Sequence, residues 1–403
     1  MSEWKTYKLG ELPIQFIDGD RGKNYPKGDD FSKVGHCLFL NAGNVTKNGW
    51  DFSENVYISE EKDNLLRNGK LERGDIVLTT RGTVGNVVLY TDDIPYKHIR
   101  INSGMVIIRN NNTCYNPYLY QYLRSYLFLG QVQQFQSGSA QPQIPISTLK
   151  KLTISLPHLA EQKRIADILS AIDDKIELNR RINANLEQQA QALYKSWFVD
   201  FEPFGGKMPE DWKEGTISNI VDLLNGFAFK SSDFVEKGLY KLITIKGVQD
   251  GNMSLDGADF LDIIPPKMPQ WCKLKKEDIL LSLTGNVGRC CLVDTENCLL
   301  NQRVAKLHPK EEYNRLFVYA LFRQEDMKAR MISIARGTAQ MNLSPIETGK
   351  LPLIIPSNEV LKDFGNRFNN IIHTLTNNIV ESSYLAQLRD TLLPKLMSGG
   401  IKV

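Results

Sequence analysis

Side chains that can bind nucleic acid gather in glycine-containing loops in both halves of the chain. Arginine, lysine, asparagine and glutamine can read base edges and hold phosphates, because they carry hydrogen-bonding groups on side chains long enough to reach a groove. A neighbouring glycine lets the backbone approach such a surface closely. Each residue alone is more simply a solvated side chain, so the prediction rests on the group. The candidates are Arg21, Lys23, Asn24, Lys27, Arg81, Lys230, Lys246, Gln249, Arg289, Gln302, Arg303 and Arg336.

The sequence offers no pattern for catalysis on DNA. Adenine methylation needs a cofactor-binding glycine loop and an Asn/Asp-Pro-Pro-aromatic run that holds a flipped base. Asn116-Pro117-Tyr118 lacks the second proline, and no GxxxxGK[ST] phosphate loop is present. The histidines, at positions 36, 98, 158, 308 and 373, show no spacing typical of a metal site or a catalytic triad. The sequence therefore predicts no catalytic residue, no metal ligand and no cofactor on this chain.

Composition is that of an ordinary globular protein. The chain has 403 residues, of which 42% are hydrophobic and 24% charged, enough for two to three domains. No apolar run approaches the roughly 20 residues of a membrane span, and no signal pattern opens the chain, so we expect a cytoplasmic protein. Six cysteines without a CxxC pair predict reduced thiols. The net charge of +3 neither demands nor excludes nucleic acid.

A unit of roughly 200 residues occurs twice. The run Gly138-Ser139-Ala140-Gln141 leads to Pro157, and Gly337-Thr338-Ala339-Gln340 leads to Pro356, with one offset, 356 − 157 = 199. Earlier landmarks repeat with slightly different offsets, which indicates loop insertions. Two similar modules on one chain can contact two related half-sites, as DNA-binding dimers do.

The matched polar residues have two interpretations. Gln141 and Gln340 can bind adenine through the side-chain amide, or they can cap backbone groups in a turn. We favour the structural role, because different half-sites would not require the same reader. The same interpretation is favoured for Asn102 and Asn301, which share the offset of 199, since 301 − 102 = 199.

Each repeat divides into a mixed front and a helical back. In the fronts, short β-rich runs separated by Gly, Asn and Asp turns predict strands, and a longer apolar segment predicts a helix, so each front is an α+β domain of about 150 residues. The expected strands are 76–80, 86–90, 105–109, 239–245 and 279–283, with closing strands at 152–157 and 351–356, and the expected helices are 117–135 and 315–334.

The backs show the four-three spacing of a coiled coil. Both seams turn polar near the middle, and antiparallel pairing within the chain would bring Asn183 near Asn378 and Asn179 near Ser382. The alternative is that these asparagines mark a drift of the apolar stripe toward solvent. The expected pairing positions are Ile165, Leu169, Ile172, Ile176, Asn179, Asn183, Leu186, Leu193 and Trp197, with Phe364, Phe368, Ile371, Leu375, Asn378, Leu385, Leu392 and Leu396. The predicted fold class is α+β, with two pseudo-repeated domains separated by two long antiparallel coiled-coil helices.

Two runs carry a resemblance to a known family. The run from Leu193 to Pro203, LYKSWFVDFEP, resembles the end of the central helix in specificity subunits of type I restriction-modification enzymes, and Leu392 to Gly399 resembles their C-terminal ending. The resemblance covers essentially the whole chain. It implies target recognition domains at 1–157 and 204–356, a central spacer helix at 158–203, and a C-terminal spacer helix at 357–403 that pairs with it.

The resemblance also implies a function. Such a chain is a noncatalytic subunit that recognises a bipartite double-stranded DNA site and assembles two methyltransferase subunits and, in the full complex, restriction and translocase subunits. S-adenosylmethionine, ATP and Mg²⁺ are then expected on those partners. Two alternatives are a coiled-coil scaffold with protein-binding front domains and a self-contained DNA-processing enzyme. The candidates for partner docking on the outward helix faces are Glu161, Arg164, Lys175, Glu177, Arg180 and Arg181.

Overall fold

The computed structural model describes residues 4–47, 49–111, 114–135, 142–337 and 341–403. Its contacts divide the chain into two compact units. Unit 1 consists of Met1–Asp174 together with Leu385–Val403, and unit 2 is Lys175–Tyr384. Both ends of the chain therefore belong to the same unit.

Unit 1 is built on a four-stranded antiparallel sheet with the order β2 (Ile14–Asp18), β10 (Met105–Asn110), β7 (Ile76–Thr79) and β8 (Val87–Leu89). Successive side chains of a strand point to opposite faces. Accordingly, Ile76 and Leu78 enter one hydrophobic core, and Val77 enters another. The sheet is covered on both faces, which explains why the inner strands β7 and β10 are apolar over most of their length.

Smaller elements complete unit 1. A second sheet has the order β6 (Tyr57–Ile58), β3 (Cys37–Phe39) and β9 (Ile99–Arg100), and helix α1 (Glu60–Leu65) follows β6. The remaining elements are β1 (Lys5–Lys8) paired with β11 (Thr153–Leu156), β4 (Val45–Thr46) paired with β5 (Gly49–Trp50), and helices α2 (Asn116–Arg124), α3 (Tyr126–Phe135) and α4 (Ile146–Leu149).

Unit 2 repeats this plan. Its main sheet has the order β13 (Val221–Asn225), β20 (Val304–Pro309), β17 (Ile279–Ser282) and β18 (Cys290–Leu292), which matches the order in unit 1 strand for strand. The predicted duplication is therefore confirmed. The other elements are the sheet β15 (Phe260–Leu261), β14 (Tyr240–Ile243), β19 (Cys298–Leu300) and β16 (Lys273–Leu274), the pair β12 (Lys213–Thr216) and β21 (Pro352–Ile355), and helices α6 (Arg315–Phe322), α7 (Glu325–Ile334) and α8 (Pro345–Gly349).

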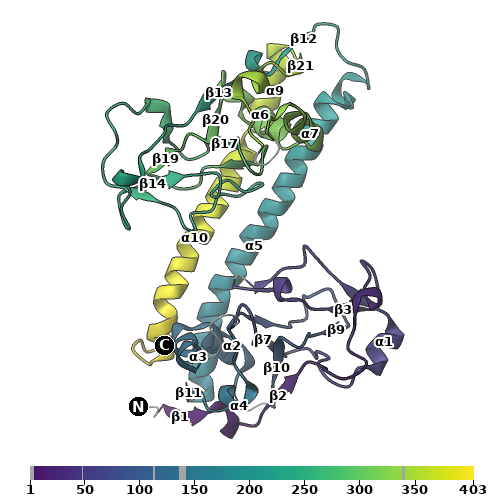
Figure 1. Cartoon of the computed structure of the whole chain (residues 1–403), viewed down its shortest axis with the longest axis vertical. Coiled ribbons are helices and arrows are strands. Elements are labelled where there is room, and N and C mark those ends of the chain that lie inside the picture. The colour runs from purple at the N-terminus through teal and green to yellow at the C-terminus, as the bar shows by residue number, and fades with distance from the viewer. Residues whose placement is uncertain (1–3, 48, 112–113, 136–141, 338–340) are drawn as a thin grey trace. The chain divides into compact units, whose positions relative to one another are not determined.

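Two long helices contribute to both units (Figure 1). Helix α5 (Leu159–Phe198) runs for 40 residues, and the C-terminal segment forms α9 (Asn358–Phe368) and α10 (Asn370–Met397). Residues of these helices lie in the main cores, Leu169 and Leu396 in that of unit 1 and Trp197 and Leu375 in that of unit 2. The helices therefore contribute to the cores of both units.

The antiparallel arrangement of the helices is visible in unit 2. Asn378 donates its side-chain amide to Oδ1 of Asn183 at 2.8 Å, and Asn179 Nδ2 lies 3.3 Å from Oγ of Ser382. The partner's number rises along α10 as the number falls along α5, as antiparallel helices require. Asn179 is only 1% exposed, so the polar middle of the seam faces the partner helix and not solvent. All the pairing positions expected from the sequence are buried or half-buried.

Three helices expected in one piece are divided. The segment 117–135 breaks at Ser125, 315–334 breaks between Arg323 and Gln324, and the C-terminal segment breaks at Asn369. At Asn369 the cause is a side chain that bonds to another segment, since its Oδ1 accepts the backbone N–H of Leu316 at 3.0 Å. Among the residues that the structure describes, no helix has the length and apolarity needed to cross a membrane.

Candidate nucleic-acid interface

Three loops of unit 1 meet at the turn Asn102–Gly104. Arg21 donates from Nη2 to the carbonyl of Ser103 at 3.2 Å, and the backbone N–H of Arg81 donates to the carbonyl of Gly104 at 3.2 Å. Gly19 lies so close to this turn that a Cβ there would be 2.3 Å from the carbonyl oxygen of Asn102. Two of the candidate arginines, far apart in sequence, are thus fixed on the same junction.

Unit 2 contains the corresponding junction at Asn301–Arg303. A Cβ on Gly226 would be 2.1 Å from the carbonyl oxygen of Asn301, and the backbone N–H of Gln302 donates to Phe227 at 2.9 Å. The third loop arrives through Leu283, whose N–H donates to the carbonyl of Arg303 at 3.0 Å. The side chains of Gln302 and Arg303 are exposed at this junction. Both units therefore present polar side chains from the same meeting point of three loops.

The matched asparagines shape these turns. Asn102 Oδ1 accepts the N–H of Gly104 at 2.8 Å, and Asn301 Oδ1 accepts the N–H of Arg303 at 3.4 Å. A side-chain oxygen that accepts from the backbone two residues later stabilises a turn. The asparagines thus support the turn backbone in both repeats. Gln141 and Gln340, for which the same interpretation was favoured, lie outside the described residues.

The DNA-binding candidates in unit 1 differ in whether their side chains bond to other parts of the protein. Arg21 is half exposed and pairs with Asp18 at 3.0 Å, so its charge is partly compensated. Asn24 donates to the carbonyl of Leu65 at 3.3 Å. Lys23, Lys27 and Arg81 are exposed. The exposed cations are the better phosphate contacts, because they need not give up an internal partner to bind DNA.

A second group in unit 2 lies on the loop 246–252. Gln249 accepts a hydrogen bond from Arg289 and donates from Nε2 to the carbonyl of Lys246 at 2.7 Å. Gln249 and Arg289 therefore hold each other in place, while the Lys246 side chain is exposed. Asp250 fixes the same loop through bonds to Arg323 at 2.7 Å and Lys328 at 2.8 Å.

The last two candidates are on separate loops. Lys230 is exposed after β13. Arg336 is also exposed, and its backbone pairs with Asn342 by two hydrogen bonds of 2.9 and 2.7 Å. Asn342 in turn forms a β-bridge with Thr284, next to the junction of unit 2. Arg336 is thus placed near that junction, whereas the described contacts of Lys230 do not connect it to the junction.

Two arginines missed by the sequence analysis attach α2 and α6 to α5. In unit 1, Arg124 pairs with Asp173 of α5 at 2.6 Å. In unit 2, Arg323 reaches Glu187 of α5 at 3.4 Å. The two arginines occupy equivalent repeat positions, since 323 − 124 = 199. That match was available in the sequence and is the signal that could have identified them.

In unit 1, Asp173 forms ion pairs with two arginines, Arg124 and Arg389. Oδ1 of Asp173 accepts from Arg389 of α10 at 2.8 Å, and Gln121 donates to Oδ2, the oxygen that also binds Arg124, at 2.7 Å. Burial raises the pKa of this carboxyl, but the guanidinium groups of Arg124 and Arg389 outweigh burial and leave the pKa below its ordinary value. Asp173 is thus held as a carboxylate that ties α2, α5 and α10 together.

The outward helix charges require corrections. Glu161 was expected on an outward face but is buried, because the first turn of α5 packs into unit 1. Lys175 bonds to Asn179 at 3.0 Å and to Glu381 of α10 at 3.1 Å, so it bridges the helices. Exposed charges remain at Arg164, and at Arg180 and Arg181, which both pair with Glu177 at 2.7 Å.

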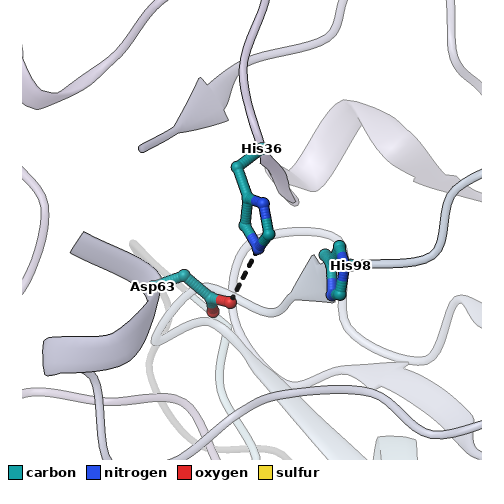
Figure 2. Close-up of side chains that lie close together, drawn as sticks. All are labelled: His36, Asp63 and His98. Carbon is teal, nitrogen blue, oxygen red and sulfur yellow. Dashed lines mark ion pairs between the residues drawn. The ribbon is translucent and has the colours of Figure 1, made fainter. Parts of the chain in front are cut away.

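The histidines also differ from expectation, because two of them come together with a carboxylate. His36, Asp63 and His98 place their potential ligand atoms within 4.8 Å of one another (Figure 2). Residues separated by 27 and 35 positions, since 63 − 36 = 27 and 98 − 63 = 35, show no motif spacing. The fold brings them together by pairing β3 with β9 and by placing α1 beside them.

Comparison with known proteins agrees with this architecture. The family model described as "Type I restriction modification DNA specificity domain" matches residues 1–188 and 209–381. The chain is 25% identical to the type I restriction enzyme HindI specificity subunit of Haemophilus influenzae, with all of both chains covered. It is 24% identical to the MjaIX specificity subunit of Methanocaldococcus jannaschii, covering 87% of this chain and 84% of that protein.

A solved structure shares the fold. The S subunit of a type I restriction-modification system from M. genitalium superposes with a TM-score of 0.59 at 19% identity, covering 98% of this chain and 96% of that one. The two matches of the family model coincide with the two repeats, and they cover most of the chain. The chain belongs to the family of type I restriction-modification DNA specificity proteins.

Proposed function

We propose that this chain is the noncatalytic subunit that gives a type I restriction-modification enzyme its DNA sequence specificity, and that it recognises a bipartite site. The observation that carries this function is the duplicated three-loop junction. In each unit the same turn fixes loops that carry arginine or glutamine side chains, which are the groups that read bases and hold phosphates. Two such units in one chain supply one reader for each half of a split sequence.

The helices have a separate role in this proposal. Helix α5 is continuous and contributes to the cores of both units. A continuous helix is stiff compared with a flexible linker, so it supports a fixed gap between the two half-sites. Lys230, Lys246 and Arg336 then add contacts in unit 2, and Lys23 and Lys27 add contacts in unit 1.

Specificity subunits of this family act with modification and restriction subunits and bind DNA. We propose that this chain assembles two methyltransferase subunits, one for each repeat. The exposed Arg164, Arg180 and Arg181 of α5, with the half-buried Glu177, are candidate docking residues. S-adenosylmethionine, ATP and Mg²⁺ belong to the partner subunits in this scheme.

A protein that selects sites on chromosomal DNA must act where that DNA is, which in a bacterium or archaeon is the cytoplasm. The family gives no support to the alternatives of a scaffold or a self-contained enzyme.

The function is tested by co-expressing the chain with its cognate methyltransferase subunit in a host without adenine methylation. Modified adenines are then mapped by single-molecule sequencing. The expected result is a new split motif with two specified halves and a constant gap. A stable complex that modifies adenines without sequence preference would overturn the proposal.

Paired variants assign the halves. Replacing Arg303 with Ala should relax or weaken recognition of one half-site, and replacing Arg81 with Ala should affect the other half. Loss of one good base contact costs about 1–3 kcal/mol, so modification of the altered half should drop roughly tenfold to a hundredfold. Asp256→Ala, at an exposed carboxylate of unit 2, serves as the control. Equal effects of R303A and R81A on both halves would contradict the assignment of one unit to each half.

A further inference from the structure

His36, Asp63 and His98 belong to three different segments of unit 1. His36 directly precedes β3, Asp63 lies in α1, and His98 directly precedes β9. Figure 2 shows His36 pointing toward the Asp63 carboxylate, with His98 beside it. The two imidazole rings are stacked, with centroids 4.2 Å apart and planes inclined by 18°. All three side chains therefore converge on one half-buried place.

The distance between Nε2 of His36 and Oδ2 of Asp63 suits two ligands of one metal ion better than a hydrogen bond. Nε2 of His36 lies 3.6 Å from Oδ2 of Asp63, which is too long for a hydrogen bond. Two ligands on a tetrahedral Zn²⁺ are about 3.4 Å apart, given bonds of roughly 2.0–2.2 Å to nitrogen and oxygen. Within the described part of the chain, neither imidazole makes a hydrogen bond. Two nitrogen donors and one oxygen donor thus lie within 4.8 Å of one another, and rotation of the stacked imidazoles would direct them at one ion.

The carboxylate is fixed for such a role. Asp63 is completely buried, and its Oδ1 accepts from Nε of Arg100. Arg100 is itself held by the carbonyls of Asp63 at 2.8 Å and Leu66 at 3.0 Å. Metal-binding carboxylates are commonly oriented by hydrogen bonds to the oxygen that does not face the ion. Oδ2 faces His36 and Lys70.

Lys70 already bonds to the carboxylate oxygen that an ion would use. Its Nζ lies 2.5 Å from Oδ2 of Asp63, while its side chain is 41% exposed. A lysine on a long flexible stem can move its ammonium group into water without a change of the backbone. Lys70 is therefore a competitor for the same carboxylate oxygen, and its removal is a specific test for the site.

Among the described residues, unit 2 has no cluster of two histidines and a carboxylate like this one. The backbone bonds Leu38 to His98 and Lys241 to Asn297 are equivalent, which places Arg100 opposite Leu299 in the repeat, since 299 − 100 = 199. Leu299 lies in a buried cluster with Leu242 and Leu261. Buried ionic groups generally stabilise a fold less than well-packed apolar residues do. A buried Asp63–Arg100 charge pair, at a strand position that unit 2 fills with the buried Leu299, therefore points to a role beyond packing.

We propose that His36, Asp63 and His98 form a binding site for a first-row divalent metal ion, with Zn²⁺ as the leading candidate. Water completes the coordination, and binding displaces Lys70 from Asp63. The donor set of two imidazoles and one carboxylate suits Zn²⁺ better than Mg²⁺ or Ca²⁺, which prefer oxygen ligands. The ion cross-links the starts of β3 and β9 to α1, so its effect is on the stability of this part of unit 1. This inference is independent of the proposed DNA function.

The test uses the full-length chain, freed of any affinity tag and stripped with a chelator. Zn²⁺ binding is measured by competition with a metal-sensitive dye, and Co²⁺ binding by visible absorption. The expected result is one saturable site and a higher Tm with Zn²⁺. His36→Asn and His98→Asn should each weaken Zn²⁺ binding by roughly tenfold to a hundredfold or more. His308→Asn, at an exposed histidine on β20, is the matched control and should bind Zn²⁺ like the unaltered chain.

Lys70→Met distinguishes this cluster from any other site. Because the competing ammonium is removed, Zn²⁺ affinity should rise at least about tenfold. Circular dichroism verifies that each variant is folded. Absence of saturable binding in the unaltered chain, including the case in which only K70M binds, would overturn the proposal. Binding that is unchanged in H36N and H98N would overturn it as well.

Discussion

Single polar residues decide which register the long helices adopt. Asn179 shares its side-chain amide between Glu381 at 2.8 Å and Ser382 at 3.3 Å, and it receives Lys175 at 3.0 Å. A seam of leucines alone would tolerate a slip by one heptad, but these contacts exist in one register only. The asparagines therefore specify the pairing and sacrifice some of the stability that apolar residues would provide.

Replacing Asn179 with Ala should destabilise unit 2 by about 1–3 kcal/mol, because the Asn179 side chain is buried and its hydrogen bonds to Glu381 and Ser382 are lost. Urea unfolding followed by circular dichroism measures this effect. Asn185→Ala is the control, because Asn185 is exposed on the same helix and should change stability by less than about 0.5 kcal/mol. Equal effects of the two substitutions would show that Asn179 has no special role.

Asp294 gives unit 2 a dependence on pH. Burial raises the pKa of this carboxyl to about 6, although Lys241 and Lys276 oppose the shift. A carboxyl whose pKa is higher in the folded than in the unfolded state favours folding below the unfolded pKa, and this contribution is lost as pH rises through about 6. Asp294→Asn should therefore stabilise the protein at pH 8 by about 1–2 kcal/mol more than at pH 5. Urea midpoints at both pH values measure the difference, and Asp256→Asn, at an exposed carboxylate, should show none.

The sequence predicted the contacts of Asn183 with Asn378 and of Asn179 with Ser382, because these residues lie on the regular heptad spacing of the two helices. It missed the burial of Glu161 and the approach of His36 to His98. Both features depend on how segments distant in sequence pack together, and no local sequence pattern indicates such packing. The offset of 199 does relate Arg124 to Arg323. Their acidic partners on α5 are not related in this way, since the positions equivalent to Asp173 and Glu187 are Ile372 and Ala386.

At the scale of elements, strands were easier to predict than the ends of helices. The apolar runs of β7, β10 and β17 are continuous because both faces of each main sheet are buried. Helix breaks were missed because they are made by local bonds and close contacts. Ser125 illustrates this, since its Oγ donates to the carbonyl of Tyr122 at 2.6 Å and accepts from the N–H of Phe128 at 3.3 Å.

Gly365 of α9 marks a close contact of this kind. A Cβ at this position would lie 2.1 Å from the carbonyl oxygen of Tyr313, so backbone must move to accommodate it. Gly365→Ala should destabilise unit 2 by about 2–4 kcal/mol, despite the higher helix propensity of alanine. Gly130→Ala is the matched control, because Gly130 lies in helix α3 with open space around it and should gain about 0.5–1 kcal/mol. Thermal unfolding of both variants checks the opposite signs.

At the scale of the whole molecule, both ends of the chain belong to unit 1. Leu393, Leu396 and Met397 lie in the same hydrophobic core as Leu9 and Ile154. The heptad pattern predicted that the C-terminal helix pairs with α5. It did not predict that the end of this helix completes the first domain, because the apolar stripe of a helix does not identify the sheet and helices on which it packs.

Two leucines of α10 should separate the stabilities of the units. Leu396 and Leu375 are both 2% exposed, but the first is in the core of unit 1 and the second in that of unit 2. Each change to Ala should cost about 2–5 kcal/mol. Hydrogen exchange should show that L396A first loses protection in β7 and β10, whereas L375A first loses it in β17 and β20. The same pattern of loss in both variants would mean that the units open together.

The core of unit 1 is built from two segments of the chain, and the ribosome makes them at different times. A ribosome makes the strands of unit 1 before unit 2, but the segment Leu385–Val403 leaves it after unit 2. The first domain therefore waits, with part of its apolar surface uncovered, while the second domain is made and begins to fold. A stop codon placed directly after the codons of unit 2 would accordingly damage unit 1, most of which is encoded before them.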